Sequence, residues 1–85
     1  MQRMHYFYVL QSLKDSKLYY GSTSNLKRRL KEHSEGKVVS TRSRIPVELL
    51  YYEAYQEVAQ ARKREKQVKK SGNARKVLSA RICNK

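Results

Sequence analysis

Hydrophobic residues cluster in three short stretches bounded by polar residues, a pattern that indicates strands. His5–Gln11 and Val47–Tyr55 are rich in aromatic and β-branched residues, which favour a pleated, half-buried backbone. Leu18–Gly21 indicates a further strand, and the polar segment Lys14–Lys17 before it is typical of a turn. We therefore expect the first two strands to form a hairpin.

The other periodic segments predict three helices, at Asn25–His33, Glu57–Lys70 and Ala74–Ile82. Ser24 is expected to be the N-cap of the first helix. Ser71–Asn73 should separate the other two, and the segment Gly36–Pro46, which has no clear period, is expected to be a loop. The order β-β-α-β-α-α predicts an α+β fold, with helices flanking a small antiparallel sheet of three strands. At this length we expect one domain, spanning residues 1–85.

One acidic residue stands out in the second predicted helix. Glu65 is the only acid among six cations between Ala61 and Lys70. Helical spacing puts it on the one apolar stripe, which turns toward the rest of the protein. An inward carboxylate is costly unless a positive group compensates it. Glu65 is therefore either an anchor for a divalent metal ion or the partner of an arginine, Arg62 or one elsewhere in the chain.

The charge of the chain indicates a polyanionic partner. Twenty Lys and Arg residues against seven Asp and Glu give a net charge of +13, and nucleic acid is the leading partner because phosphate contacts release counterions. RNA-binding proteins are equally basic, so charge does not separate binding from catalysis. A membrane surface fits less well, because the apolar positions are consumed by a core and leave no long amphipathic anchor.

The rest of the composition narrows the class of protein. The single cysteine, Cys83, excludes a disulfide framework or a Cys-rich zinc site within the chain and suits a reducing compartment. No apolar run approaches the roughly 20 residues that span a bilayer. The start of the chain shows no secretion signal. We therefore expect a cytoplasmic protein.

Five further residues suggest chemistry around Glu65. Tyr8 and Tyr19 lie on the first two strands and, in a suitable register, point to one face. Gly21 permits a close backbone approach or a positive φ. Arg29 and His33 are four residues apart, so their side chains are neighbours on one helix.

These residue types suit phosphodiester hydrolysis. Arg29 offers a planar fork for phosphate oxygens, and His33 is expected to titrate near neutrality and to accept or relay a proton. A tyrosine acts as a base only where cations or a metal ease its ionisation, and Glu65 could anchor one Mg²⁺. Each residue could also have a purely structural role. Tyr8 and Tyr19 could be packing residues of the strands, Arg29 could simply face water, and His33 could satisfy a local hydrogen bond.

Taken together, these motifs resemble the GIY-YIG nuclease superfamily, and in particular its small stand-alone bacterial members. The resemblance extends from about Tyr6 to Ile82. The resemblance rests on five stretches: Tyr6-Phe7-Tyr8, Tyr19-Tyr20-Gly21, Gly21–Arg29, Ser40–Leu49 and Arg64–Lys70. Tyr6 departs from the pattern by replacing the first glycine. Ser22 stands where excision-repair members have a lysine, so Lys27 or Arg28 would have to supply that charge.

The resemblance implies cleavage of DNA that depends on a single Mg²⁺ or Mn²⁺. It assigns Tyr8 and Tyr19 to the two signature tyrosines, and places the helix arginine at Arg29 and the metal-binding glutamate at Glu65. His33 falls where some homing endonucleases carry a histidine and repair members a tyrosine.

The sequence therefore predicts a metal-dependent DNA endonuclease whose site collects Tyr8, Tyr19, Arg29, His33 and Glu65. A second set of residues is expected to bind the nucleic-acid backbone: Lys27, Arg28, Arg42, Arg44, Lys66, Lys69 and Lys70. No recognition helix is evident, so we expect loose or structure-based selectivity. The alternative is a non-catalytic DNA- or RNA-binding module that retains the fold; a protein–protein adaptor would explain neither the charge nor Glu65.

Overall fold

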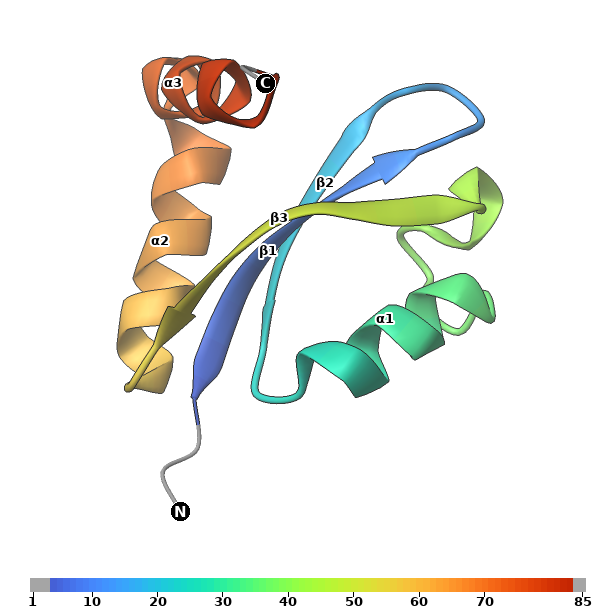
Figure 1. The fold of residues 1–85 in the computed structure, drawn as a ribbon, viewed down its shortest axis with the longest axis horizontal. Coiled ribbons are helices and arrows are strands. Elements are labelled where there is room, and N and C mark those ends of the chain that lie inside the picture. Colours follow the sequence, from blue (N-terminus) through green and yellow to red (C-terminus); the bar gives the residue numbers. More distant parts are fainter. Residues whose placement is uncertain (1–3, 84–85) are drawn as a thin grey trace.

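Three antiparallel strands form the central layer of the protein. The computed structural model describes residues 4–83, with the side chain of Cys83 outside that description. Its strands are β1 (His5–Ser12), β2 (Leu18–Thr23) and β3 (Val47–Tyr55), arranged in the order β2-β1-β3. The predicted element order β-β-α-β-α-α and the α+β class are confirmed (Figure 1).

Helices cover both faces of this sheet. Helix α1 (Leu26–Ser34) lies on one side, and α2 (Val58–Lys70) and α3 (Gly72–Cys83) lie on the other (Figure 1). A short 3₁₀ helix, η1 (Arg42–Arg44), interrupts the loop before β3. None of the helices in the described part of the chain is both long and apolar enough to cross a bilayer.

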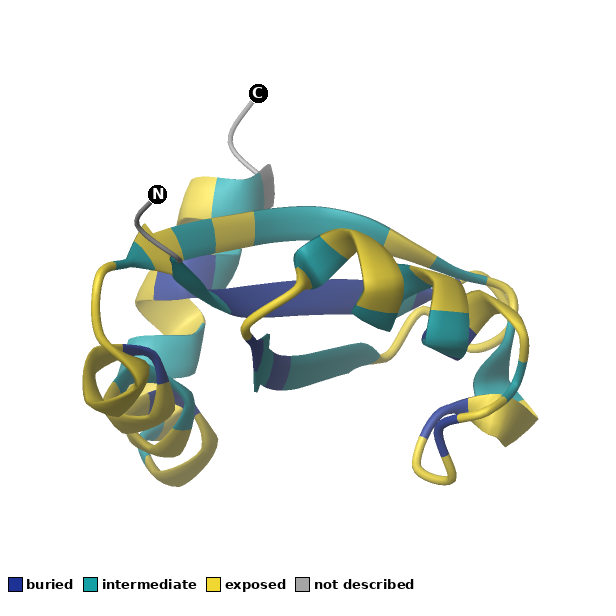
Figure 2. Ribbon diagram, turned by 90° about the horizontal axis from the view of Figure 1, so that it is seen from below, coloured by how far each residue is buried: buried dark blue, intermediate teal, exposed yellow. Residues whose placement is uncertain are grey.

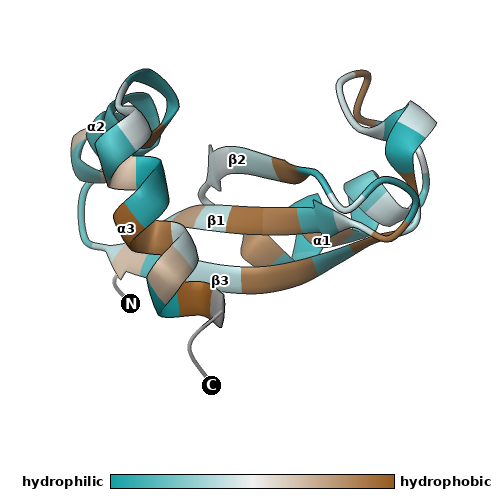
Figure 3. Cartoon of the chain, turned by 90° about the horizontal axis from the view of Figure 1, so that it is seen from above, coloured by the Kyte–Doolittle hydropathy of each residue, from teal (hydrophilic) through white to brown (hydrophobic). Residues whose placement is uncertain are grey.

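The central strand β1 separates the two packing layers. Its middle is buried on both faces, as the dark band in Figure 2 shows. Phe7 and Val9 pack against Val68 of α2 and Leu78 of α3. Because side chains alternate along a strand, Tyr8 and Leu10 point to the opposite face, toward α1. Strands β1 and β3 are hydrophobic along their central parts, whereas α2 is largely hydrophilic (Figure 3).

Three local predictions are wrong in detail. The N-cap of α1 is Asn25, not Ser24, because the Asn25 side chain accepts a hydrogen bond from the backbone N–H of Arg28 at 3.0 Å. The break between the last two helices is Ser71 alone, and α3 already begins at Gly72. Strand β2 also continues two residues past Gly21, to Thr23, and this extension adds Ser22 to the edge of the sheet.

Candidate active site

The pairing of β1 with β2 brings the two signature tyrosines together. Tyr8 is opposite Gly21 and Leu10 is opposite Tyr19, so Tyr8, Tyr19 and Gly21 share one face of the sheet. The ring centroids of Tyr8 and Tyr19 are 6.4 Å apart. The expectation that both tyrosines point to one face is confirmed.

Gly21 provides the space for the Tyr8 ring. A Cβ atom at this position would lie 2.5 Å from the Tyr8 hydroxyl oxygen and 2.6 Å from Tyr8 Cζ. Positive φ is found at Gly36 and not at Gly21. Of the two expectations for Gly21, the close approach is confirmed and the positive φ is wrong.

His33 joins the tyrosine pair from α1. Its ring centroid is 5.8 Å from that of Tyr8 and 5.2 Å from that of Tyr19. His33 Nε2 is 2.9 Å from Tyr8 Oη, and His33 Nδ1 is 2.7 Å from Thr41 Oγ1. Tyr8, His33 and Thr41 are at most 1% exposed. The three side chains therefore form a continuous buried hydrogen-bonded chain.

Burial changes the titration of this chain. It lowers the pKa of His33 to about 4, with a further lowering by the positive charge of Arg29. The expectation that His33 titrates near neutrality is therefore wrong, and the ring is neutral at pH 7. Burial also raises the pKa of Tyr8 to about 12, although Arg29 acts in the opposite direction. Tyr8 is a neutral phenol at pH 7.

Arg29 lies at the open side of the tyrosine pair. Its side chain is 37% exposed, and Nη1 donates to Glu32 Oε1 at 3.0 Å. Arg29, Tyr19 and Glu65 are all close enough to influence the pKa of Tyr8. Tyr8, Tyr19 and His33 therefore lie side by side on one face of the sheet, with Arg29 next to them.

Glu65 lies on the other face of the sheet, beside β2. Ser22 Oγ donates to Glu65 Oε1 at 2.7 Å, and Lys69 Nζ donates to Glu65 Oε2 at 2.6 Å. The Glu65 side chain is 22% exposed, so the predicted inward orientation is confirmed. The predicted ion pair with Arg62 or another arginine is wrong, because the partner is Lys69. Lys69 Nζ also lies 6.0 Å from the centroid of the Tyr19 ring.

The donor set fits one divalent ion of the kind the resemblance implies. Within residues 4–83 there is no group of three His, Cys, Asp or Glu side chains that could hold a metal. Mg²⁺ is commonly bound through one or two carboxylates, with water and substrate phosphates as its other ligands. Glu65 could supply the carboxylate, and the ammonium group of Lys69 shows that a cation is stable against Oε2. Lys69 would have to move for the ion to bind.

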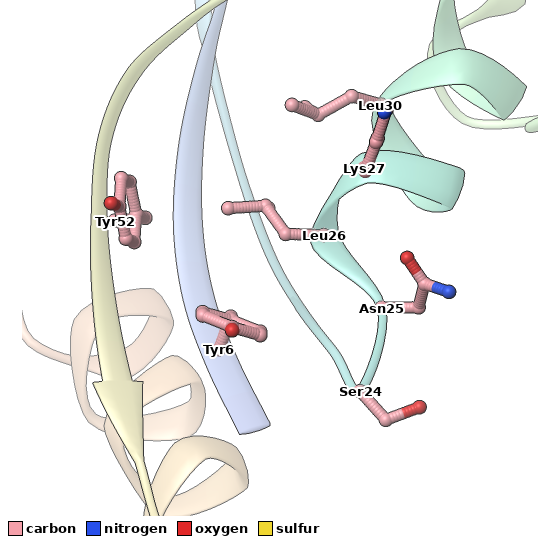
Figure 4. Close-up of a pocket in the computed structure, with 7 residues that line it drawn as sticks. All are labelled: Tyr6, Ser24, Asn25, Leu26, Lys27, Leu30 and Tyr52. Atoms are coloured by element: carbon pink, nitrogen blue, oxygen red, sulfur yellow. The ribbon is translucent and has the colours of Figure 1, made fainter. Parts of the chain in front are cut away.

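The remaining cations predicted to bind nucleic acid lie on several elements. Five of them are exposed on α1, η1 and α2: Lys27, Arg28, Arg42, Lys66 and Lys70. Arg44 is partly buried, with Nε 4.0 Å from Asp15 Oδ2. Lys27 also lines a groove of about 430 Å³ in which Tyr6 and Tyr52 face Leu26 and Leu30 (Figure 4). None of the five predicted catalytic residues lines this groove.

Sequence reasoning missed a second polar cluster, next to Glu65. Glu53 accepts hydrogen bonds from Tyr51, Tyr55 and Arg64, with Arg64 Nε at 3.0 Å and Nη2 at 3.2 Å. The alternation of Tyr51, Glu53 and Tyr55 along β3 was a usable signal, since it puts the acid on the face of two aromatic residues. Thr41 gave no such signal, because it lies in a loop without a period.

Comparisons with known proteins agree with this geometry. Residues 4–77 match the family model described as the GIY-YIG catalytic domain. A UPF0213 protein of Bacillus licheniformis is 46% identical over 67 residues, covering 78% of this chain and 68% of that protein. Another, of Natronomonas pharaonis, is 42% identical over 73 residues and covers 85% of each chain.

A solved structure is also similar. The solution NMR structure of a UPF0213 protein from Bacillus halodurans is 32% identical, has a TM-score of 0.57, and covers 94% of this chain and 85% of that chain. The fold and the family model therefore agree over nearly the whole described chain, which belongs to the GIY-YIG catalytic domain family.

Proposed function

We propose that this protein is a metal-dependent endonuclease that hydrolyses phosphodiester bonds in DNA. The observation that carries the proposal is the cluster of Tyr8, Tyr19 and His33 on one face of the sheet, with Arg29 and the carboxylate of Glu65 close enough to affect the pKa of Tyr8. Two phenols, a guanidinium, an imidazole and a carboxylate from four different elements are more than packing of the sheet requires.

Arg29 is the residue proposed to bind the scissile phosphate. Its guanidinium is partly exposed and lies beside Tyr8, where a planar fork can bind two non-bridging oxygens. In hydrolysis the oxygen of water bonds to phosphorus, the bond to the leaving oxygen breaks, and the water gives up a proton. Tyr8 is proposed to lose its own proton to solvent; the phenolate then orients this water and accepts its proton.

Ionisation of Tyr8 has to be assisted, because burial raises its pKa to about 12. Arg29 and a hydrogen bond from His33 would stabilise the phenolate, and Tyr19 would complete the wall of the site. A divalent ion held by Glu65 would neutralise phosphate charge and lower the pKa of bound water. The exposed cations on α1, η1 and α2 would hold the backbone without reading sequence.

The test is cleavage of supercoiled plasmid by the wild-type protein and by Glu65→Gln, with Mn²⁺ or Mg²⁺. Glu65→Gln keeps the shape of the side chain and should slow nicking roughly 100-fold or more. Glu48→Gln, at an exposed position on β3, makes the same charge change and should leave the rate unaltered. Equal cleavage by wild type and Glu65→Gln would mean a contaminating nuclease and would end the proposal. Single-strand, duplex, flap and RNA substrates, assayed side by side, would define the selectivity.

One observation favours a second candidate, a non-catalytic DNA- or RNA-binding module. Lys69 already compensates Glu65, so an inward acid can be stable without a metal ion. This alternative predicts binding that weakens steeply with salt, is indifferent to Mn²⁺, and is the same in wild type and Glu65→Gln.

A further inference from the structure

Thr41 has an unusual use of its hydroxyl group. It is the N-cap residue of η1, yet its side chain makes no capping hydrogen bond to that helix. Its backbone is held independently, since Thr41 N donates to Val38 O at 3.1 Å and Thr41 O accepts from Arg44 N at 2.9 Å. The hydroxyl contacts His33 Nδ1 at 2.7 Å, and within residues 4–83 the structure gives it no other partner.

A neutral imidazole between two hydroxyl groups has two arrangements. In the first, Tyr8 donates to Nε2, and Nδ1–H donates to Thr41. In the second, Thr41 donates to Nδ1, and Nε2–H donates to Tyr8. Each arrangement leaves one hydroxyl hydrogen without a partner in the buried chain, at Thr41 in the first and at Tyr8 in the second.

The lengths of the two hydrogen bonds of His33 favour the second arrangement. Hydrogen bonds donated by hydroxyl groups are typically shorter than those donated by N–H groups. The Thr41–His33 contact, at 2.7 Å, has the length of a bond donated by a hydroxyl group. The His33–Tyr8 contact, at 2.9 Å, has the length of a bond donated by an N–H group.

We propose that Thr41 is a positioning residue, which holds His33 in the Nε2–H tautomer so that His33 donates a hydrogen bond to Tyr8 Oη. His33 then stabilises the ionised phenol and is not the base that deprotonates it. The assignment of a role in cleavage rests on the proposed function, whereas the tautomer itself is a property of the unliganded protein.

The test of the tautomer is ¹⁵N NMR of the imidazole nitrogens at pH 7, where His33 is neutral. The wild-type protein should show Nε2 as the protonated nitrogen and Nδ1 as the unprotonated one. Thr41→Val, which has the same shape without the hydroxyl group, should mix the two tautomers. Thr41→Ser, which restores a hydroxyl donor, should return the wild-type pattern.

Several results would overturn the proposal. A protonated Nδ1 in the wild-type protein does so without any variant, and so does an unchanged tautomer in Thr41→Val. In the cleavage assay, Thr41→Val should lower kcat on the order of tenfold with KM unchanged, and Thr41→Ser should recover it. Loss through KM alone would contradict positioning. An Nε2–H tautomer in a protein that cleaves no DNA would refute the proposed function and leave the tautomer assignment standing.

Discussion

Substituting Gly21 by alanine is the sharpest test of how the site is packed. The added Cβ would lie 2.5 Å from Tyr8 Oη, 2.6 Å from Cζ and 3.0 Å from Cε1, against about 3.5 Å for a relaxed contact. The ring therefore has to move by about 1 Å. Because Tyr8 Oη is 2.9 Å from His33 Nε2, a displacement of that size breaks the hydrogen bond.

The expected cost in stability combines three effects. Overpacking costs about 1–3 kcal/mol, and the lost hydrogen bond about 1 kcal/mol. Alanine also restricts the unfolded chain, which returns about 0.4–1 kcal/mol. The free energy of unfolding should fall by about 2 kcal/mol, which corresponds to roughly 8–16 °C in Tm for a domain of this size.

Thermal unfolding followed by circular dichroism measures this change, and Gly72→Ala is the matched control. At Gly72 the added Cβ meets only Arg75 Nη2, at 3.8 Å, and alanine is the better helix former. Gly72→Ala should therefore keep or raise the Tm. Equal Tm values for the two variants would refute the close packing of Tyr8 on β2.

Two further predictions concern charged pairs. Lys69→Met removes the ammonium group that competes for Glu65 Oε2, so Mn²⁺ should bind about fivefold more tightly, a gain of about 1 kcal/mol. Calorimetric titration of Lys70→Met, which loses the same charge at an exposed neighbour, is the control, and an equal gain there would contradict direct competition. Burial acts to raise the pKa of Glu53, but hydrogen bonds from Arg64 and two tyrosines lower it below its usual value of 4.5. The folded pKa is thus below the unfolded one, so this stabilisation is complete above pH 4.5 and is lost as pH falls through the folded pKa. Glu53→Gln should lower the free energy of unfolding by about 2 kcal/mol at pH 7. When the urea midpoint is plotted against pH, the variant should lose less stability at acid pH than the wild type. Parallel curves for the two proteins would show that Glu53 is not the titrating group.

The fold could be predicted from the sequence because its signals are local. Aromatic and β-branched clusters identify β1 and β3, and the period of two along β1 and β2 places Tyr8 and Tyr19 on one face once the hairpin is assumed. The lone acid of a basic helix was sufficient to find Glu65. Position on an element is thus encoded within a few residues of the chain.

The properties of the site residues could not be predicted in the same way. The lowered pKa of His33 depends on burial under the loop that carries Thr41, eight residues later. The partner of Glu65 is an exception, because Lys69 follows it by four residues, a spacing at which a glutamate and a lysine of one helix pair. The N-cap was misplaced by one residue because Ser24 and Asn25 both favour that position.

The bond between Glu53 and Arg64 has a consequence for the neighbouring residue in α2. Successive side chains of a helix point about 100° apart. When Arg64 binds Glu53 on β3, the next side chain, Glu65, therefore points toward Ser22 on β2. Helix α2 is therefore hydrogen-bonded to both outer strands of the sheet, and these two contacts fix its rotation about its own axis. Loss of the Glu53–Arg64 contact on β3 would therefore turn Glu65 away from Tyr8 and Tyr19, although neither tyrosine is changed.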